Sequence, residues 1–297
     1  MEGKFRWMVV TAIAPIAWGS TYVVTRELLP AEHPLWGALL RALPAGLILL
    51  ALARRLPRGS WWWKSLVLGT LNIGAFFVLV YLAAVLLPSS VASTVMATSA
   101  GVILVLAWPL LAQRPRLVSA IGAAIGFVGV AVMLGPGGEP INGWGVLISL
   151  VAMTSSSVGF LLARRWGGDV PLLASTAWQL IAGSLLLAPV AIIVEGPPPT
   201  LDATSLWGFA YITIIGTAVA FVAWFAGLRH LPAGVVGVIG LLNPVTGVLL
   251  GTLLVGELLG PAQIVGIALV LTGVLVGQFA ARPSRRPAPQ HEPAASR

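Results

Sequence analysis

Residues 87–112, LPSSVASTVMATSAGVILVLAWPLLA, and residues 231–256, LPAGVVGVIGLLNPVTGVLLGTLLVG, are two apolar runs that begin with the same Leu-Pro pair. Each run is long enough to cross a bilayer, because a helix of about 20 apolar residues spans the hydrocarbon core. The segments that follow match at the same offset of 144 (231 against 87), where Gly122, Ala124, Gly129 and Val130 correspond to Gly266, Ala268, Gly273 and Val274. These matches predict a repeated unit built from membrane-spanning helices.

A second match extends the repeat toward the N-terminus. Pro34, Ala45-Gly46 and Leu49-Leu50 recur 137 positions later as Pro171, Ala182-Gly183 and Leu186-Leu187. Runs of about 20 apolar residues, separated by charged or turn-forming segments, give ten spans in all. Their approximate bounds are 7–26, 34–53, 65–87, 90–112, 117–135, 143–163, 171–194, 205–228, 233–255 and 262–280. Each half holds five spans, and because five is odd, the second copy is predicted to be inverted in the membrane.

Composition narrows the class of protein. Of the 297 residues, 58% are hydrophobic and 9% are charged, whereas a soluble domain carries about 25% charged residues. A soluble globular enzyme, a secreted scaffold and a disordered chain are therefore excluded. The chain has no cysteine, and its three histidines lie far apart in predicted loops or the tail. We therefore expect no disulfide, no metal, no cofactor and no enzymatic site, since no cluster of acid, His or Cys can perform such chemistry.

Lysine and arginine predict the orientation. With the N-terminus in the cytoplasm, all but two of the 17 Lys and Arg residues fall in cytoplasmic segments or the tail, as the positive-inside rule requires. The exceptions are Arg26, on the outer side, and Arg41, inside the second span. We expect a multi-pass protein of a bacterial-type inner membrane with both termini cytoplasmic, in contact with membrane lipid. The net charge of +8 then needs no nucleic-acid partner.

The two repeats define the expected domain organisation. Residues 1–138 form the first five-span repeat, residues 139–281 form the second, inverted repeat, and residues 282–297, rich in Pro, Ala and Arg, form a disordered cytoplasmic tail. Inverted repeats recur in secondary transporters, where two similar halves exchange packings that open to opposite sides. The sequence therefore favours a transporter over a duplicated scaffold.

These features together resemble the EamA family of the drug/metabolite transporter superfamily. The residues that carry the resemblance are Trp18-Gly19-Ser20, Arg41, the Leu-Pro pairs at 87–88 and 231–232, and Glu257 followed by Gly266 and Gly273. Within the family the chain most resembles the YddG-type exporters of aromatic amino acids. It departs from the family pattern at Gln113, which stands where an acid is common. We interpret that departure as structural, because the position faces the cytoplasmic boundary.

The resemblance implies an all-α bundle around a central cavity. Spans 3, 4, 8 and 9 would be central, spans 1, 2, 6 and 7 would surround them, and spans 5 and 10 would pack at the back. The glycines at 122, 126 and 129 share one helix face, and with those at 266 and 273 they permit close helix approach. We interpret them as packing residues.

Candidate substrate-binding residues are the polar, charged and aromatic groups deep in the spans. Arg41 is the basic group within a span, and it either braces a neighbouring carbonyl or binds a substrate carboxylate. Asn243-Pro244 interrupts span nine and frees the carbonyl of Gly240. For most of the others, ordinary interhelical packing is the competing interpretation. The complete predicted set is Trp18, Ser20, Arg41, Asn72, Phe76, Trp178, Gln179, Trp224 and Asn243.

The charges in the spans also constrain the cargo. No Asp or Glu lies in the middle of a predicted span, whereas a proton-driven transporter or an exporter of cations needs a buried carboxylate or His. We therefore expect export of small neutral or zwitterionic metabolites by alternating access, with amino acids, aromatic ones included, as the favoured cargo. The alternatives are nucleobases, nucleosides or sugars as cargo, or a channel or scaffold instead of a transporter. The sequence leaves the oligomeric state open, and a monomer is compatible with it.

Overall fold

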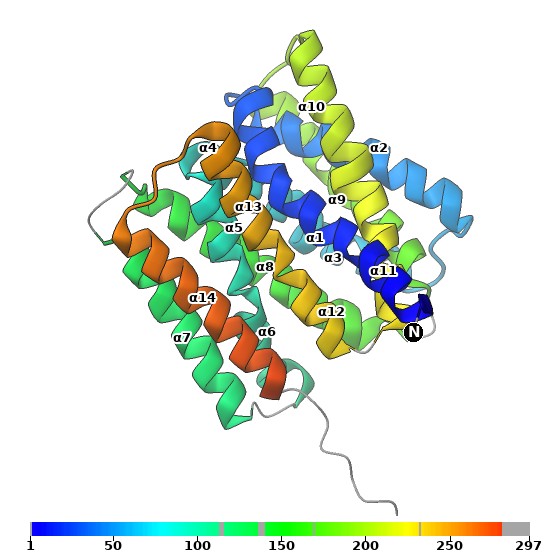
Figure 1. Ribbon diagram of the computed structural model, residues 1–297. Helices are drawn as coiled ribbons and strands as arrows, with labels where there is room; N and C mark the ends of the chain where they lie inside the picture. The colour runs from blue at the N-terminus through cyan, green and yellow to red at the C-terminus, as the bar shows by residue number, and fades with distance from the viewer. Residues whose placement is uncertain (1, 113–115, 136–139, 169, 232, 281–297) are drawn as a thin grey trace, which may run out of the picture.

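A computed structural model of the chain describes residues 2–112, 116–135, 140–168, 170–231 and 233–280, and these residues contain helices and no strand (Figure 1). The helices form ten rods, each a single helix or a run of consecutive helical segments that crosses the molecule once, and several of the rods are interrupted. The first five are α1 (Glu2–Leu28), α2 (Pro34–Ala53), α3–η1–α4 (Trp61–Gly69, Thr70–Gly74, Ala75–Leu86), α5–α6 (Ser89–Ala97, Ser99–Leu111) and α7 (Leu117–Met133). The second five are α8 (Gly143–Trp166), α9 (Leu172–Val194), α10–η2–α11 (Ala203–Thr213, Ile214–Val219, Ala220–His230), α12–α13–η3 (Ala233–Gly240, Leu242–Leu250, Gly251–Val255) and α14 (Pro261–Ala280).

The predicted all-α fold and its ten crossings are confirmed. Eight rods have 20–28 residues and are apolar enough to span a bilayer, and the shorter apolar helices Leu117–Met133 and Pro261–Gly277 complete the set. Five crossings in each half place the halves in opposite orientations. Gln113 and the predicted tail, 282–297, lie outside the described residues.

Most interruptions of the helices follow the repeat; the exception is the π-helical turn η3, whose counterpart at 107–111 lies within α6. The π-helical turns η1 and η2 begin at Thr70 and Ile214, which are related by the offset of 144 residues found in the sequence. The break in the fourth crossing falls at Thr98, and the break in the ninth falls at Leu241, within one residue of the equivalent position. The break at Leu241 confirms the predicted interruption of span nine, and it places Pro244 in the first turn of α13, where a missing N–H is tolerated.

The glycine faces of α7 and α14 pack directly on each other, at one edge of the bundle (Figure 1). A Cβ on Gly122 would lie 2.7 Å from the backbone N of Gly277, and a Cβ on Gly129 would lie 2.7 Å from the backbone O of Gly266. Only glycine permits this approach, because any side chain would meet backbone. The prediction that spans 5 and 10 pack together through these glycines is confirmed.

Two ends of the bundle differ in charge. The acidic end carries Glu27, Glu195, Asp202 and Glu257, and the basic end carries Arg54, Lys64, Arg164 and Arg229. At the acidic end α5 packs against α13, where Gly247 makes room for Ser93. Toward the basic end α6 packs mainly against α7 and α8, whereas α12 packs mainly against α1, and both also contact α14. The fourth and ninth crossings are therefore in close contact near the acidic end, where α5 meets α13.

Candidate functional site

The most unusual buried group is the guanidinium of Arg41 on α2. Arg41 is only 8% exposed, yet no carboxylate among the described residues pairs with it. Its Nε donates to Thr217 Oγ1 at 3.0 Å, and its Nη2 donates to the carbonyl oxygen of Gly216 at 3.4 Å. Its Cζ lies 4.2 Å from the ring centroid of Phe77, within the range of a cation–π contact.

The partners of Arg41 are available because of the π-helical turn. Gly216 and Thr217 both lie in η2, where the widened turn disturbs the regular i→i−4 ladder. Thr217 is fixed in turn, because its hydroxyl donates to the carbonyl oxygen of Ile212 at 2.8 Å. The π turn therefore presents one hydroxyl oxygen and one carbonyl oxygen to the guanidinium.

A second polar contact joins Asn72 of η1 to Gln179 of α9. Asn72 Nδ2 donates to Gln179 Oε1 at 2.7 Å, and both residues are buried. The amide oxygen of Asn72 has no hydrogen-bond partner among the described residues. It lies against Gly159 of α8, where any side chain would displace it. This contact therefore leaves the amide oxygen of Asn72 buried without a hydrogen-bond partner among the described residues.

The two polar contacts are counterparts in the inverted repeat. Asn72 and Gly216 are related by the offset of 144, and Gln179 follows the counterpart of Arg41, Trp178, at the offset of 137. In each half the helix of the second crossing therefore reaches the π turn of the third crossing in the other half. One contact carries a positive charge, whereas the other consists of neutral amides.

Aromatic side chains gather between α1 and α11. The ring centroid of Trp18 lies 5.3 Å from that of Trp224 and 5.8 Å from that of Phe221. Ser20, two residues along α1, makes a 2.7 Å hydrogen bond with the hydroxyl of Tyr211. The structure therefore brings Trp18 and Trp224 together, with Ser20 two residues farther along α1.

Two more predicted residues lie close to these groups: Asn243 lies beside α1, and Phe76 lies beside Phe77. The backbone of Asn243 on α13 touches Gly19 of α1 so closely that no side chain fits there. The amide oxygen of Asn243 is buried without a hydrogen-bond partner among the described residues. Phe76 is partly buried and packs against the same core as Phe77, the ring under Arg41.

Trp178 belongs to the same buried core as Phe77, but its polar contact is made elsewhere. Its indole Nε1 donates to the backbone carbonyl oxygen of Arg55 at 2.7 Å, and its ring packs at 5.7 Å on Trp61. These contacts tie α9 to the segment that follows α2, at the basic end of the bundle.

Sequence reasoning missed a buried carboxylate at the acidic end. The side chain of Glu257 is 1% exposed, with Arg26 Nη1 3.5 Å from its Oε1. Its oxygens accept the backbone N–H groups of Ser89 and Ser90, the first turn of α5. The sequence correctly predicted that no Asp or Glu lies in the middle of a span, but it did not predict that the carboxylate of Glu257, just beyond the ninth crossing, is buried. Glu257 follows the last turn of the ninth crossing, and Gly256, with φ of 76°, turns the chain there.

Glu195 forms a similar contact at the N-terminus of α2. Its carboxylate accepts the backbone N–H of Leu35 at 2.7 Å and that of Trp36 at 3.0 Å. A carboxylate at a helix N-terminus satisfies free amides and complements the macrodipole. The signal in the sequence was an acidic residue just after a span, on the side where another helix begins.

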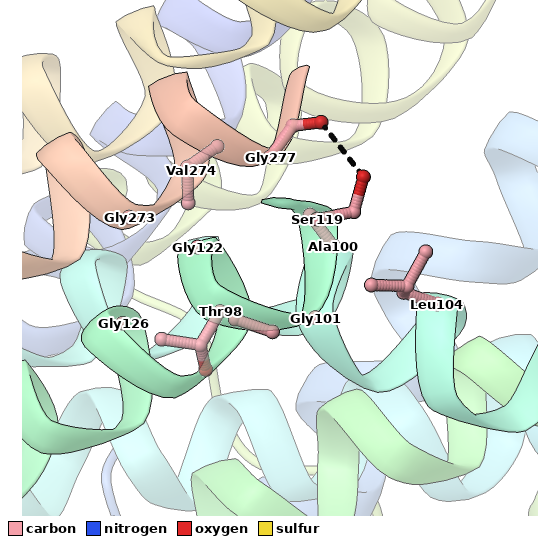
Figure 2. A pocket seen from close by; sticks show the side chains of 11 residues that line it. Thr98, Ala100, Gly101, Leu104, Ser119, Gly122, Gly126, Gly273, Val274 and Gly277 are labelled. Atoms are coloured by element: carbon pink, nitrogen blue, oxygen red, sulfur yellow. Dashed lines mark hydrogen bonds between the residues drawn. The ribbon is translucent and has the colours of Figure 1, made fainter. Parts of the chain in front are cut away.

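One pocket of about 150 Å³ lies between α6, α7 and α14. Figure 2 shows that small residues line it, with Ser119 donating to the Gly277 carbonyl across it at 3.4 Å. None of the predicted substrate-binding residues lines this pocket. It therefore belongs to the packing of these three helices and not to the polar contacts described above.

Comparison with known proteins identifies the fold and the family. The EamA-like transporter family matches residues 5–135 and again residues 143–277. Protein PecM from Dickeya dadantii is 36% identical over 275 residues, covering 92% of each chain. The uncharacterized inner membrane transporter YedA from Escherichia coli is 29% identical, covering 88% of this chain and 87% of that one.

A solved crystal structure shares the fold, with a TM-score of 0.65 and 20% identity over 93% of this chain and 97% of that one. The two family matches together cover nearly all of the helical bundle. This chain is a multi-pass membrane protein that belongs to the EamA-like transporter family of the drug/metabolite transporter superfamily.

Proposed function

We propose that this protein exports small neutral or zwitterionic metabolites, with amino acids, aromatic ones included, as its cargo. The observation that carries the proposal is the pair of repeat-related polar contacts, Arg41 with η2 and Gln179 with η1. Such groups are costly within a membrane span and mark substrate pathways in transporters. Most of the predicted substrate residues lie on or beside these contacts or near the aromatic rings of α1 and α11: Trp18, Ser20, Arg41, Asn72, Phe76, Gln179, Trp224 and Asn243. Trp178 packs in the same core as Phe77, but its indole bonds to the backbone of Arg55.

The chemistry of these groups suits a zwitterion with an apolar side chain. A guanidinium binds carboxylate, and the free amide oxygens of Asn72 and Asn243 accept hydrogen bonds from an ammonium. The rings of Trp18 and Trp224 offer faces for an aromatic or aliphatic side chain. The buried carboxylate, Glu257, is engaged by Arg26 and two amides, so it does not favour a cationic cargo.

The packing of the fourth and ninth crossings supports alternating access. The two crossings meet near the acidic end, through α5 and α13, whereas toward the basic end α6 packs mainly on α7 and α8 and α12 packs mainly on α1. Inverted repeats allow the complementary arrangement, in which contacts at one end are exchanged for equivalent contacts at the other. We propose that the basic end faces the cytoplasm, because Lys and Arg concentrate there, so that both termini are cytoplasmic.

The test is transport by the purified protein in liposomes. Vesicles preloaded with one amino acid are assayed for uptake of a labelled one, with and without imposed ion gradients. We expect saturable counterflow of neutral amino acids that needs no ion gradient. If unlabelled nucleosides or sugars inhibit uptake and unlabelled amino acids do not, then the transported molecule is a nucleoside or a sugar and not an amino acid. Non-saturable flux would indicate a channel.

A further inference from the structure

We propose that Arg41 is the site that binds the carboxylate of the transported molecule, through the free end of its guanidinium. This inference deepens the proposed function and relies on it for the kind of ligand.

The hydrogen bonds of Arg41 leave one edge of the guanidinium free. The group has five N–H donors in a planar fork. Nε and Nη2, which form the side edge, bond to Thr217 Oγ1 and the Gly216 carbonyl oxygen. Nη1 and the second N–H of Nη2 have no partner among the described residues, and together they form the end edge. Two parallel N–H groups on one edge match the two oxygens of a carboxylate.

The guanidinium is also held in a fixed orientation. Thr217 accepts from Nε while donating its own proton to Ile212, so its oxygen cannot turn away without losing a second hydrogen bond. The ring of Phe77 covers one face of the guanidinium. Thr217 is therefore a positioning residue. A donor already ordered in this way loses little rotamer entropy when a ligand binds.

The inverted repeat supplies an internal comparison. One residue after the position related to Arg41, Gln179 reaches the other π turn, η1, and bonds to Asn72 with no formal charge. Joining the second crossing of one half to the π turn of the other half therefore does not require a cation. A buried charge without a carboxylate partner is costly, and the neutral counterpart shows that packing does not explain it. A negatively charged group on the ligand does, because its binding supplies the missing partner.

The experiment compares carboxylates with their amides. Purified full-length protein in detergent is titrated calorimetrically with L-phenylalanine, 3-phenylpropionate and the amide of each. We expect the wild type to prefer each carboxylate over its amide. Arg41→Gln should weaken binding of the carboxylates by about 10- to 100-fold, the range for losing a charge-assisted hydrogen bond, and leave binding of the amides unchanged. Arg41→Lys should retain part of the preference, because it keeps the charge without the planar fork.

Three further variants separate binding from folding. Arg58→Gln removes an exposed positive charge outside the spans and should bind every probe like the wild type. Thr217→Val leaves Arg41 in place but removes its anchor, and it should reduce the preference for carboxylates while Thr217→Ser restores it. This pair tests the inference even if Arg41→Gln does not fold.

Each outcome bears on one proposal or the other. An Arg41→Gln protein that still discriminates carboxylate from amide as the wild type does would overturn the assignment of Arg41. Wild-type protein that binds no carboxylate probe would overturn it as well. Binding of 3-phenylpropionate through Arg41, with no binding or transport of amino acids, would support the carboxylate site and refute amino-acid export.

Discussion

Removing the buried carboxylate of Glu257 tests how the two halves are joined at the acidic end. The Glu257→Ala protein leaves the N–H groups of Ser89 and Ser90 without an acceptor, and it leaves Arg26 without its buried partner. Each unsatisfied buried amide costs about 1–3 kcal/mol, and breaking a buried ion pair on one side costs about 3–5 kcal/mol. Arg26 is 31% exposed, so water takes over part of its solvation. We therefore expect a loss of about 3–5 kcal/mol in the free energy of unfolding.

The Glu257→Gln protein should lose less. Its carbonyl oxygen still accepts one of the two amides, but its NH₂ group faces the other donor and the charge is gone. We expect a loss of about 1–3 kcal/mol, the cost of one unsatisfied group. Reversible unfolding in mixed detergent micelles, followed by the fluorescence of the 12 tryptophans, measures both values.

Glu27 provides the matched control. Its carboxylate lies 3.6 Å from the same Arg26, but it is 44% exposed. An exposed ion pair contributes about 0–1 kcal/mol, so Glu27→Gln should unfold almost like the wild type. If Glu257→Ala loses no more stability than Glu27→Gln, then the contact between Glu257 and α5 does not join the halves, and the reasoning fails.

Three other predictions follow from the described contacts. Gly122→Val should drive α7 and α14 apart and lower the folded yield by size-exclusion chromatography, whereas Gly126→Ala should be tolerated, because its Cβ would lie 3.7 Å from the nearest heavy atom. Asn72→Ala and Gln179→Ala should each destabilise the protein by about 0.5–2 kcal/mol, and the double variant should lose less than their sum in a double-mutant cycle. Asp202 accepts the backbone N–H at the start of α10, which lowers its pKa below the ordinary value. Its contribution to stability is therefore present above the unfolded-state pKa and is lost as the pH falls through the folded-state pKa. The unfolding midpoint of Asp202→Asn should therefore fall less than that of the wild type when the pH is lowered through this range.

Apolar length, repeats and charge were enough to predict the rods and their number. Each predicted span overlaps one crossing, because the need for about 20 apolar residues per crossing leaves little freedom. The glycine faces of α7 and α14 were also predictable, since small residues at helical spacing permit backbones to meet. These features depend on local pattern, which a single sequence displays directly.

The π turns and the buried carboxylates were not predictable in the same way. Nothing at 70–74 marks a π turn, because the segment TLNIG contains no proline and a glycine only at its end. Thr98 likewise breaks the fourth crossing without a proline. The burial of Glu257 depends on α5, 168 residues away in the sequence. Contacts across such distances follow from how the halves pack, and the offset between repeats gave only the pairs of equivalent positions.

The carboxylates at the acidic end complement the macrodipoles of the helices that begin there. Even-numbered crossings begin there and end at the basic end, so acid at their start and Lys or Arg at their finish both complement the dipole, by about 0.3–1 kcal/mol each. Carboxylates cap α2, α5 and α10, and basic residues lie at or just after the last turns of α2, α8 and α11: Glu195, Glu257 and Asp202 on one side, and Arg54, Arg164, Arg165 and Arg229 on the other.

Odd-numbered crossings begin at the basic end, where Lys4 and Lys64 lie near their N-termini and oppose the dipole. Helix stability alone therefore does not account for this charge pattern, which is the one expected if the basic end faces the cytoplasm, as proposed above. Glu195 and Glu257 belong to the second half and cap helices of the first. Acidic residues at this end therefore also link the two halves, close to where α5 and α13 are in contact.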